Sequence, residues 1–142
     1  MSEMTFEESV NAQVALLENG RPLDAFDKFF AFDGVMYAND QIFANSAAEA
    51  REKQERYILA ATSIDGCIED LRTNAQSQIC VFRNRSSFTT SNGAIHKIDG
   101  LCWQLWSNGK VVVERYFEGA NMEQQLAAGI LDKPENLTPI VT

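Results

Sequence analysis

The sequence predicts an α+β protein in which N-terminal helices pack on a curved, mostly antiparallel sheet. Two observations lead to this class. Helical periodicity of apolar residues dominates the first part of the chain, up to about residue 62. Residues 64–118 instead have the pattern of successive strands with Asn-Gly turns between them. Helices first and hairpins afterwards are typical of an α+β fold, because the helices cover one apolar face of the sheet.

Two helices are expected at the start of the chain. Apolar residues recur at helical spacing over residues 5–19, where Thr5 and Glu8 can form a capping box and Gly20 ends the helix. A second, short helix begins at Pro22, a residue that fits the first turn of a helix. Its apolar residues form one stripe, so both helices are predicted to lie against a common core.

A strand and a third helix follow. Residues 35–38 are predicted to form a short strand that ends at Asn39-Asp40, a turn dipeptide. The third helix is expected over residues 47–62, with Ser46 as its N-cap and a glutamate three residues later as the capping-box partner.

The rest of the sheet is predicted to be long strands. Gly66 is expected to break or bulge the first strand, and Gly100 is expected to bulge the third. Ser-Asn-Gly sequences form the two later hairpin turns. The segments are 64–75, 78–90, 94–106 and 110–119, followed by a short helix over 121–131 and a tail after Pro134 that we expect to be loosely held.

The composition excludes several classes of function. A formal net charge of −8 with scattered basic residues disfavours binding to a nucleic acid. No stretch approaches the roughly 18 apolar residues of a transmembrane helix, and the N-terminus is acidic. We therefore expect a cytoplasmic protein without a membrane partner. Cys67, Cys80 and Cys102 show no paired spacing and are expected to be buried free thiols.

The order of elements resembles that of the SnoaL-like families, which belong to the superfamily of ketosteroid isomerase and nuclear transport factor two. The resemblance rests on the aromatic-rich second helix (Phe26, Phe29, Phe30) and on the hairpin Trp106-Ser-Asn-Gly-Lys-Val, and it covers about residues 6–118. It implies a single domain over residues 1–142, with 119–142 as a C-terminal extension. It also implies a cone with an internal pocket between the helices and the concave face of the sheet.

The catalytic residues of ketosteroid isomerase do not match this chain. The isomerase's aspartate base falls on Ala38, two residues before Asp40, and the tyrosine of its oxyanion hole falls on Gln13. The protonated aspartate of that hole falls near Cys102. A tyrosine in the third helix does recur, as Tyr57. Isomerisation of a steroid by that machinery is therefore disfavoured.

The same comparison assigns the faces of the last two strands, because side chains alternate along a strand. The residues expected to face the cavity are Cys102, Gln104, Trp106, Val112, Glu114 and Tyr116. The residues expected on the opposite face are Leu101, Trp103, Leu105, Val111, Val113, Arg115 and Phe117. Since an exposed apolar face of that size is unusual on a monomer, we predict a homodimer through this outer face.

Three side chains are candidates for proton transfer. His96, the only histidine, could act as a general base with Glu114 as its partner, or it could be a surface histidine near a turn. Glu114 lies in an apolar run and could have a raised pKa in a cavity, or it could pair with a basic side chain across the sheet. Asp40, beside Asn39, is either a pocket residue or part of a plain turn.

Ligand-binding residues are expected around these groups. Tyr57 and Tyr116 could donate hydrogen bonds to a carbonyl oxygen, or they could be core tyrosines. An apolar wall is expected from Phe30, Phe82 and Trp106. A lone histidine without metal-ligand spacing predicts no metal site, and the absence of a phosphate or dinucleotide motif predicts no cofactor.

Two functional hypotheses follow. In the first, a SnoaL-like protein binds a hydrophobic molecule that carries a carbonyl or hydroxyl group. Its reaction would be a cofactor-free isomerisation, cyclisation, dehydration or hydrolysis. In the second, the same cone only holds a ligand or serves as an accessory dimerisation domain. An enzyme needs a titratable group inside the cavity within reach of a hydrogen-bond donor, whereas a binding module does not.

Overall fold

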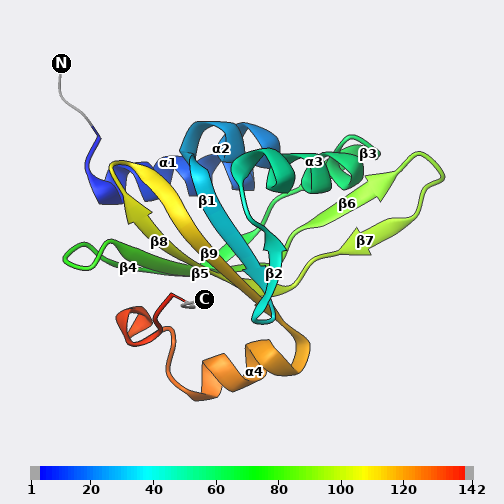
Figure 1. The fold of residues 1–142 in the computed structure, drawn as a ribbon. Coiled ribbons are helices and arrows are strands. Elements are labelled where there is room, and N and C mark those ends of the chain that lie inside the picture. Colours follow the sequence, from blue (N-terminus) through cyan, green and yellow to red (C-terminus); the bar gives the residue numbers. More distant parts are fainter. Residues whose placement is uncertain (1–3, 140–142) are drawn as a thin grey trace.

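The computed structural model describes residues 4–139, and Figure 1 shows its helices and strands. The helices are α1 (Phe6–Glu18), α2 (Pro22–Phe29), α3 (Ala47–Ile58) and α4 (Gly119–Ala127), with a 3-10 turn, η1 (Pro134–Asn136). The strands are β1 (Phe30–Ala38), β2 (Gln41–Ala44), β3 (Ala61–Asp65), β4 (Ile68–Asn74), β5 (Ile79–Asn84), β6 (Ser87–Thr90), β7 (Ile95–Lys97), β8 (Gly100–Ser107) and β9 (Lys110–Glu118). None of the described helices is long and apolar enough to cross a membrane.

The strands form two sheets. The larger sheet has the order β2-β1-β9-β8-β5-β4, and the smaller one has the order β3-β6-β7. Every described strand pair is antiparallel except β1 with β9. In Figure 1, α1, α2 and α3 lie on one side of the larger sheet, and α4 lies on the other. The α+β class and the curved, mostly antiparallel sheet predicted from the sequence are confirmed.

The predicted helix starts are confirmed by their caps. The Thr5 hydroxyl accepts a hydrogen bond from the Glu8 backbone N–H at 3.1 Å, and the Glu8 carboxylate accepts one from the Thr5 N–H at 2.9 Å. Ser46 caps α3 through the Glu49 N–H at 3.2 Å. The second bond of the predicted capping box is absent within residues 4–139, because the Glu49 carboxylate accepts from the Asn45 N–H, at 3.3 Å, instead of the Ser46 N–H. The third helix is shorter than predicted, because Ala61 already belongs to a strand.

Three of the four long strands predicted from the sequence are divided between the two sheets, and the fourth is the undivided strand β9. The breaks fall at Gly66, at Ser86 and at Asp99, so that β3, β6 and β7 form the smaller sheet beside the larger one (Figure 1). Gly66 is required at its break, because a Cβ there would lie 1.9 Å from the Leu17 carbonyl oxygen at the end of α1. The predicted break at Gly66 is thus confirmed.

The predicted bulge at Gly100 is wrong. Gly100 pairs in unbroken register with Asn84 on one side and Glu118 on the other. The irregularity lies instead between β8 and β9, where Leu105 pairs with Val113 but Trp106 pairs with Val111. Val112 is the extra residue of this bulge, and an extra residue reverses which side the preceding side chain faces.

Two apolar clusters occupy the two faces of the larger sheet. The inner cluster, toward α1 and α2, includes Val10, Phe29, Phe82, Cys102 and Trp106. It also includes Val111, which was predicted to face outward, because the bulge places it inward in place of Val112. For β8, the predicted alternation of inner and outer residues is confirmed.

The outer cluster is covered by the chain itself. Leu101, Trp103 and Phe117 are fully buried there against Met122 and Ile130 of the C-terminal segment. The face is therefore not exposed, which removes the reason for which a homodimer was predicted; the homodimer stays a prediction that sedimentation would test.

The segment after Pro134 is also held more firmly than the sequence suggested. The Trp103 indole N–H donates to the Pro134 carbonyl at 2.8 Å, and Arg115 Nη1 donates to the Thr138 carbonyl at 2.6 Å. Arg115 also pairs with Asp40, and its guanidinium lies 5.2 Å from the Phe117 ring centre. These contacts tie the C-terminal segment to the outer face.

Candidate functional site

A cavity of about 710 Å³ lies between the three N-terminal helices and the inner face of the larger sheet. Its size lies within the range of small-molecule pockets. Apolar side chains from almost every surrounding element line it, among them Phe26 of α2, Phe30 and Met36 of β1, Phe82 of β5 and Val111 of β9. The lining is therefore suited to a hydrophobic molecule, and the few polar side chains in it determine which polar groups that molecule can have.

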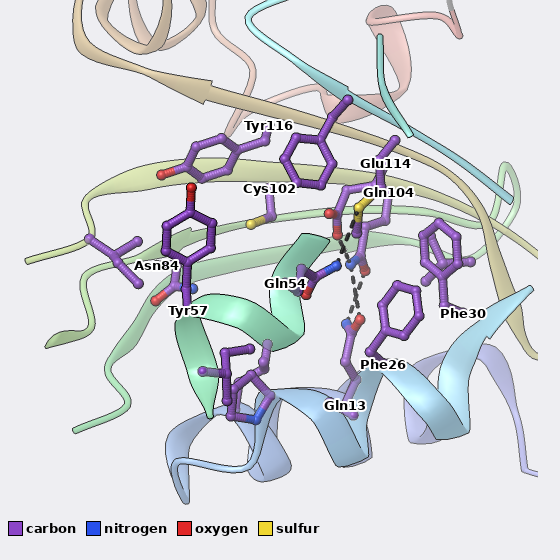
Figure 2. Close-up of a pocket in the computed structure, with 18 of the residues that line it drawn as sticks. Gln13, Phe26, Phe30, Gln54, Tyr57, Asn84, Cys102, Gln104, Glu114 and Tyr116 are labelled. Carbon is purple, nitrogen blue, oxygen red and sulfur yellow. Dashed lines mark hydrogen bonds between the residues drawn. The ribbon is translucent and has the colours of Figure 1, made fainter. Parts of the chain in front are cut away.

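Three of those polar groups form one hydrogen-bonded row (Figure 2). The amides of Gln13 on α1 and Gln104 on β8 bond to each other reciprocally, each N–H to the opposite oxygen at 2.9 Å. Gln104 Nε2 also donates to Glu114 Oε1 on β9, at 2.8 Å. Gln104 and Glu114 are direct neighbours in the β8–β9 register, so the sheet itself positions this contact.

The Glu114 carboxyl combines burial with a free oxygen. Burial raises its pKa above the ordinary value of 4.5, while the hydrogen bond from Gln104 acts in the opposite direction and lowers it. Oε1 is held by Gln104, and Oε2 makes no hydrogen bond within residues 4–139. A carboxyl group in this state can take or give a proton, or accept a hydrogen bond from a bound molecule.

The surroundings of the row are also defined by hydrogen bonds. Gln104 Oε1 accepts from the Trp106 indole N–H at 3.2 Å and from the Cys80 thiol at 3.4 Å. Cys80 and Cys102 are buried free thiols as expected, whereas Cys67 is exposed. Burial raises the pKa of the Cys80 thiol to about 12 and that of Cys102 well above its usual value, so both remain neutral thiols. Figure 2 shows Gln54 extending from α3 toward the same part of the cavity, where it donates to the Met36 sulfur at 3.5 Å.

A second polar group of the lining lies away from the row, around Tyr57 and Tyr116 (Figure 2). Tyr57, at the end of α3, is 67% exposed although it lines the cavity. The Tyr116 hydroxyl lies 3.3 Å from the Glu118 carboxylate, and burial raises its pKa. Gly100 lies directly beneath the Tyr116 ring, where a Cβ would come within 2.3 Å of it.

Solved structures resemble this chain closely in their fold. A candidate SnoaL-like polyketide cyclase from Mesorhizobium loti aligns with a TM-score of 0.66 and 21% identity, over 81% of this chain and 100% of its own. A candidate polyketide cyclase from Pseudomonas putida gives 0.64 and 17%, over 85% and 96%. The candidate hydroxylase AclR from Streptomyces galilaeus gives 0.65 and 13%, over 87% and 95%. The chain has the SnoaL-like fold. Comparisons of the sequence with family models and with curated proteins find no match.

Within this SnoaL-like fold, six residues that the sequence singled out lie together on the cavity. They are Phe30, Tyr57, Phe82, Gln104, Glu114 and Tyr116. They come from β1, α3, β5, β8 and β9, so their proximity depends on the pairing of distant strands. Their roles in binding or catalysis stay predictions.

Four other predicted site residues do not line the cavity. Trp106 is buried outside the lining, and its indole N–H donates to the lining residue Gln104. His96 is exposed on β7, where its ring stacks on Phe88 with the ring centres 4.9 Å apart, because the break at Asp99 places β7 in the smaller sheet. The residues of the predicted Asn39-Asp40 turn have positive φ, and Asp40 faces Arg115 on the outer side.

Sequence reasoning did not assign Gln13 to the site. The signal that could have found it is a polar residue within the apolar stripe of α1, three residues after Val10 and four before Leu17. A buried glutamine on such a stripe requires hydrogen-bond partners from another element. Gln104 is that partner, and its identity depends on a contact between positions that lie 91 residues apart.

Proposed function

We propose that this protein binds a hydrophobic small molecule with a carbonyl or hydroxyl group in the cavity and moves a proton on it through Glu114. The observation that carries the proposal is the Glu114 carboxyl itself, with one oxygen held by Gln104 and the other free in a largely apolar cavity. A raised pKa brings a carboxyl closer to the range in which an acid–base group works best.

No cofactor is part of this proposal, because the acid–base group, the apolar wall and the hydroxyls of the lining all come from the chain. Tyr57 and Tyr116 would orient the oxygen of the ligand. The reaction class stays open among isomerisation, cyclisation, dehydration and hydrolysis. The resemblance to candidate polyketide cyclases supports cyclisation within this range, since those proteins share the fold.

Proton transfer can be tested before the natural substrate is known. A panel of hydrophobic ketones and phenols is incubated with the protein in D₂O, and NMR follows deuterium incorporation at the carbon next to a ketone carbonyl or at the ring carbon ortho to a phenol hydroxyl. The wild type is expected to accelerate exchange for at least one compound that it binds. Glu114→Gln keeps the shape and the Gln104 contact, and is expected to lower that rate by about 10² to 10⁴.

Two residues outside the cavity provide matched controls. His96→Gln and Asp40→Asn are each expected to leave the exchange rate unchanged, because neither side chain reaches the cavity. A large loss in either variant would contradict the assignment to Glu114 and restore the role that the sequence suggested for that residue. A Glu114→Gln variant that exchanges as fast as the wild type would refute the proposal.

A binding function without catalysis is the second candidate. The observation that favours it is that neither Tyr57 nor Tyr116 donates a hydrogen bond to Glu114 within residues 4–139, so the tyrosine hydroxyls and the acid–base group do not form one network. In this case the panel would include tight ligands and Glu114→Gln would weaken their binding. No compound would exchange faster with protein than without it.

A further inference from the structure

The Gln13–Gln104 pair does not by itself fix the direction in which either amide faces. Each amide donates to and accepts from the other at 2.9 Å. Each amide ends in an NH₂ group that donates and an oxygen that accepts. If both amides rotated by half a turn, both bonds would therefore re-form with the donor and acceptor of each exchanged. The orientation that Gln104 presents to Glu114 must therefore come from another contact.

That contact is the Trp106 indole. An indole N–H can only donate, and the Trp106 N–H lies 3.2 Å from Gln104 Oε1. Both side chains are almost completely buried, so a rotated Gln104 would place its NH₂ against another N–H with no water to replace the lost acceptor. The Cys80 thiol, 3.4 Å from the same oxygen, favours the same orientation but is a weak donor.

The orientation of the Gln104 amide determines whether its N–H or its oxygen faces the Glu114 carboxyl. With its oxygen toward Trp106, Gln104 turns an N–H toward Glu114 Oε1, at 2.8 Å, and that N–H favours the ionised carboxylate. In the rotated form, an amide oxygen would face the carboxyl, and only a protonated carboxyl can donate to it. The two orientations thus favour opposite protonation states of the same group.

We propose that Trp106 is a positioning residue that locks the Gln104 amide, so that Glu114 Oε1 always accepts a hydrogen bond and the proton is taken up and released at Oε2. This inference rests on the proposed function only in giving Glu114 an acid–base role. The fixed orientation of the Gln104 amide is a property of the ligand-free protein and does not depend on that role.

The other titratable groups around Glu114 come from four elements, three of which contribute them to the cavity lining. They are Cys80 on β5, adjacent to the row, Cys102 on β8, Tyr116 and Glu118 at the far end of β9, and Lys53 and Tyr57 on α3. The helices α1 and α2 contribute none to the lining. Replacing Trp106 by phenylalanine changes none of these charges, so a change in the Glu114 titration would report the amide alone.

The test is a ¹³C NMR titration of the Glu114 side-chain carboxyl in the ligand-free protein, with its resonance assigned from the Glu114→Gln variant. In Trp106→Phe the amide is free to turn, and we expect the protonation equilibrium of Glu114 to move about tenfold or more toward the protonated form. Trp103→Phe is the matched control: it removes an indole N–H from the same strand, on the outer face, and is expected to leave the Glu114 titration unchanged.

A folded Trp106→Phe protein with the wild-type titration would overturn the inference. If that variant does not fold, the wild type provides a second measurement. The Trp106 indole proton must then exchange slowly with solvent on both sides of the Glu114 titration, and fast exchange on either side overturns the lock. A failure of the proposed function looks different, because it appears as absent proton exchange on ligands while the effect of Trp106→Phe remains.

Discussion

The two faces of β5, β8 and β9 are built from alternate residues of the same strands, yet one is filled and the other is hollow. On the outer face, Trp103 and Phe117 are completely buried under the C-terminal segment. On the inner face, Gln104 and Glu114 border a cavity of about 710 Å³. The two faces therefore differ in what they contribute. The outer face contributes packing energy, and the inner face contains a cavity and a titratable group at some cost in stability.

The largest effect on stability is expected from removing the largest side chain of the filled outer face. Trp103→Ala deletes a completely buried indole and its bond to the Pro134 carbonyl. We expect the free energy of unfolding to fall by about 3–5 kcal/mol, measured by urea denaturation. Val112→Ala, at the partly exposed bulge residue of β9, is the control and is expected to cost far less. Equal losses in the two variants would show that Trp103 contributes no more packing energy than a partly exposed residue.

The next effect concerns the hollow face. Gly100→Ala places a Cβ within 2.3 Å of the Tyr116 ring, so the ring must move toward the cavity. We expect a loss of about 1–3 kcal/mol, as for an overpacked core site. Tyr116→Ala removes the collision, so the double variant is expected to lose less than the sum of the two single variants. Strict additivity in that cycle would mean that the ring does not rest on Gly100.

Much of the fold could be predicted, because its signals are local. The Thr5 capping box and the Ser107-Asn108-Gly109 turn depend only on neighbouring residues, and both are present. The inner and outer residues of β8 followed from simple alternation up to Trp106. Even Glu114 could be placed on the inner face, since the bulge at Val112 lies before it and leaves its direction unchanged.

The remaining features depend on contacts that no local pattern contains. The bulge at Val112 gives no sequence signal within its valine run, so Val111 was placed on the wrong side. The exposure of His96 follows from the break at Asp99, which separates β7 from β8. The outer face seemed to need a second copy of the protein, because alternation does not show that Met122 and Ile130 return to cover it.

The smallest effect is a dependence of stability on pH that comes from the Glu114 carboxyl on the inner face. Burial raises the pKa of Glu114 above 4.5 in the folded protein, so the folded state holds this proton more tightly than the unfolded chain. The stability associated with this group is complete below pH 4.5 and is lost as the pH rises through the raised value. Above that window, Glu114→Gln should be more stable than the wild type by about 1.4 kcal/mol for each unit between the two pKa values.

The measurement is urea unfolding of the wild type and Glu114→Gln at a series of pH values. Asp27 and Asp99 have lowered pKa values because each accepts hydrogen bonds from an arginine, so their contribution is lost as the pH falls. Both are present in both proteins, and the difference between the two curves isolates Glu114. A difference that grows from pH 4.5 upward would establish that the hollow face carries a carboxyl whose ionisation opposes folding. A flat difference would mean that Glu114 is as well solvated in the cavity as in the unfolded chain, and the cavity would then lack the low polarity on which its acid–base role depends.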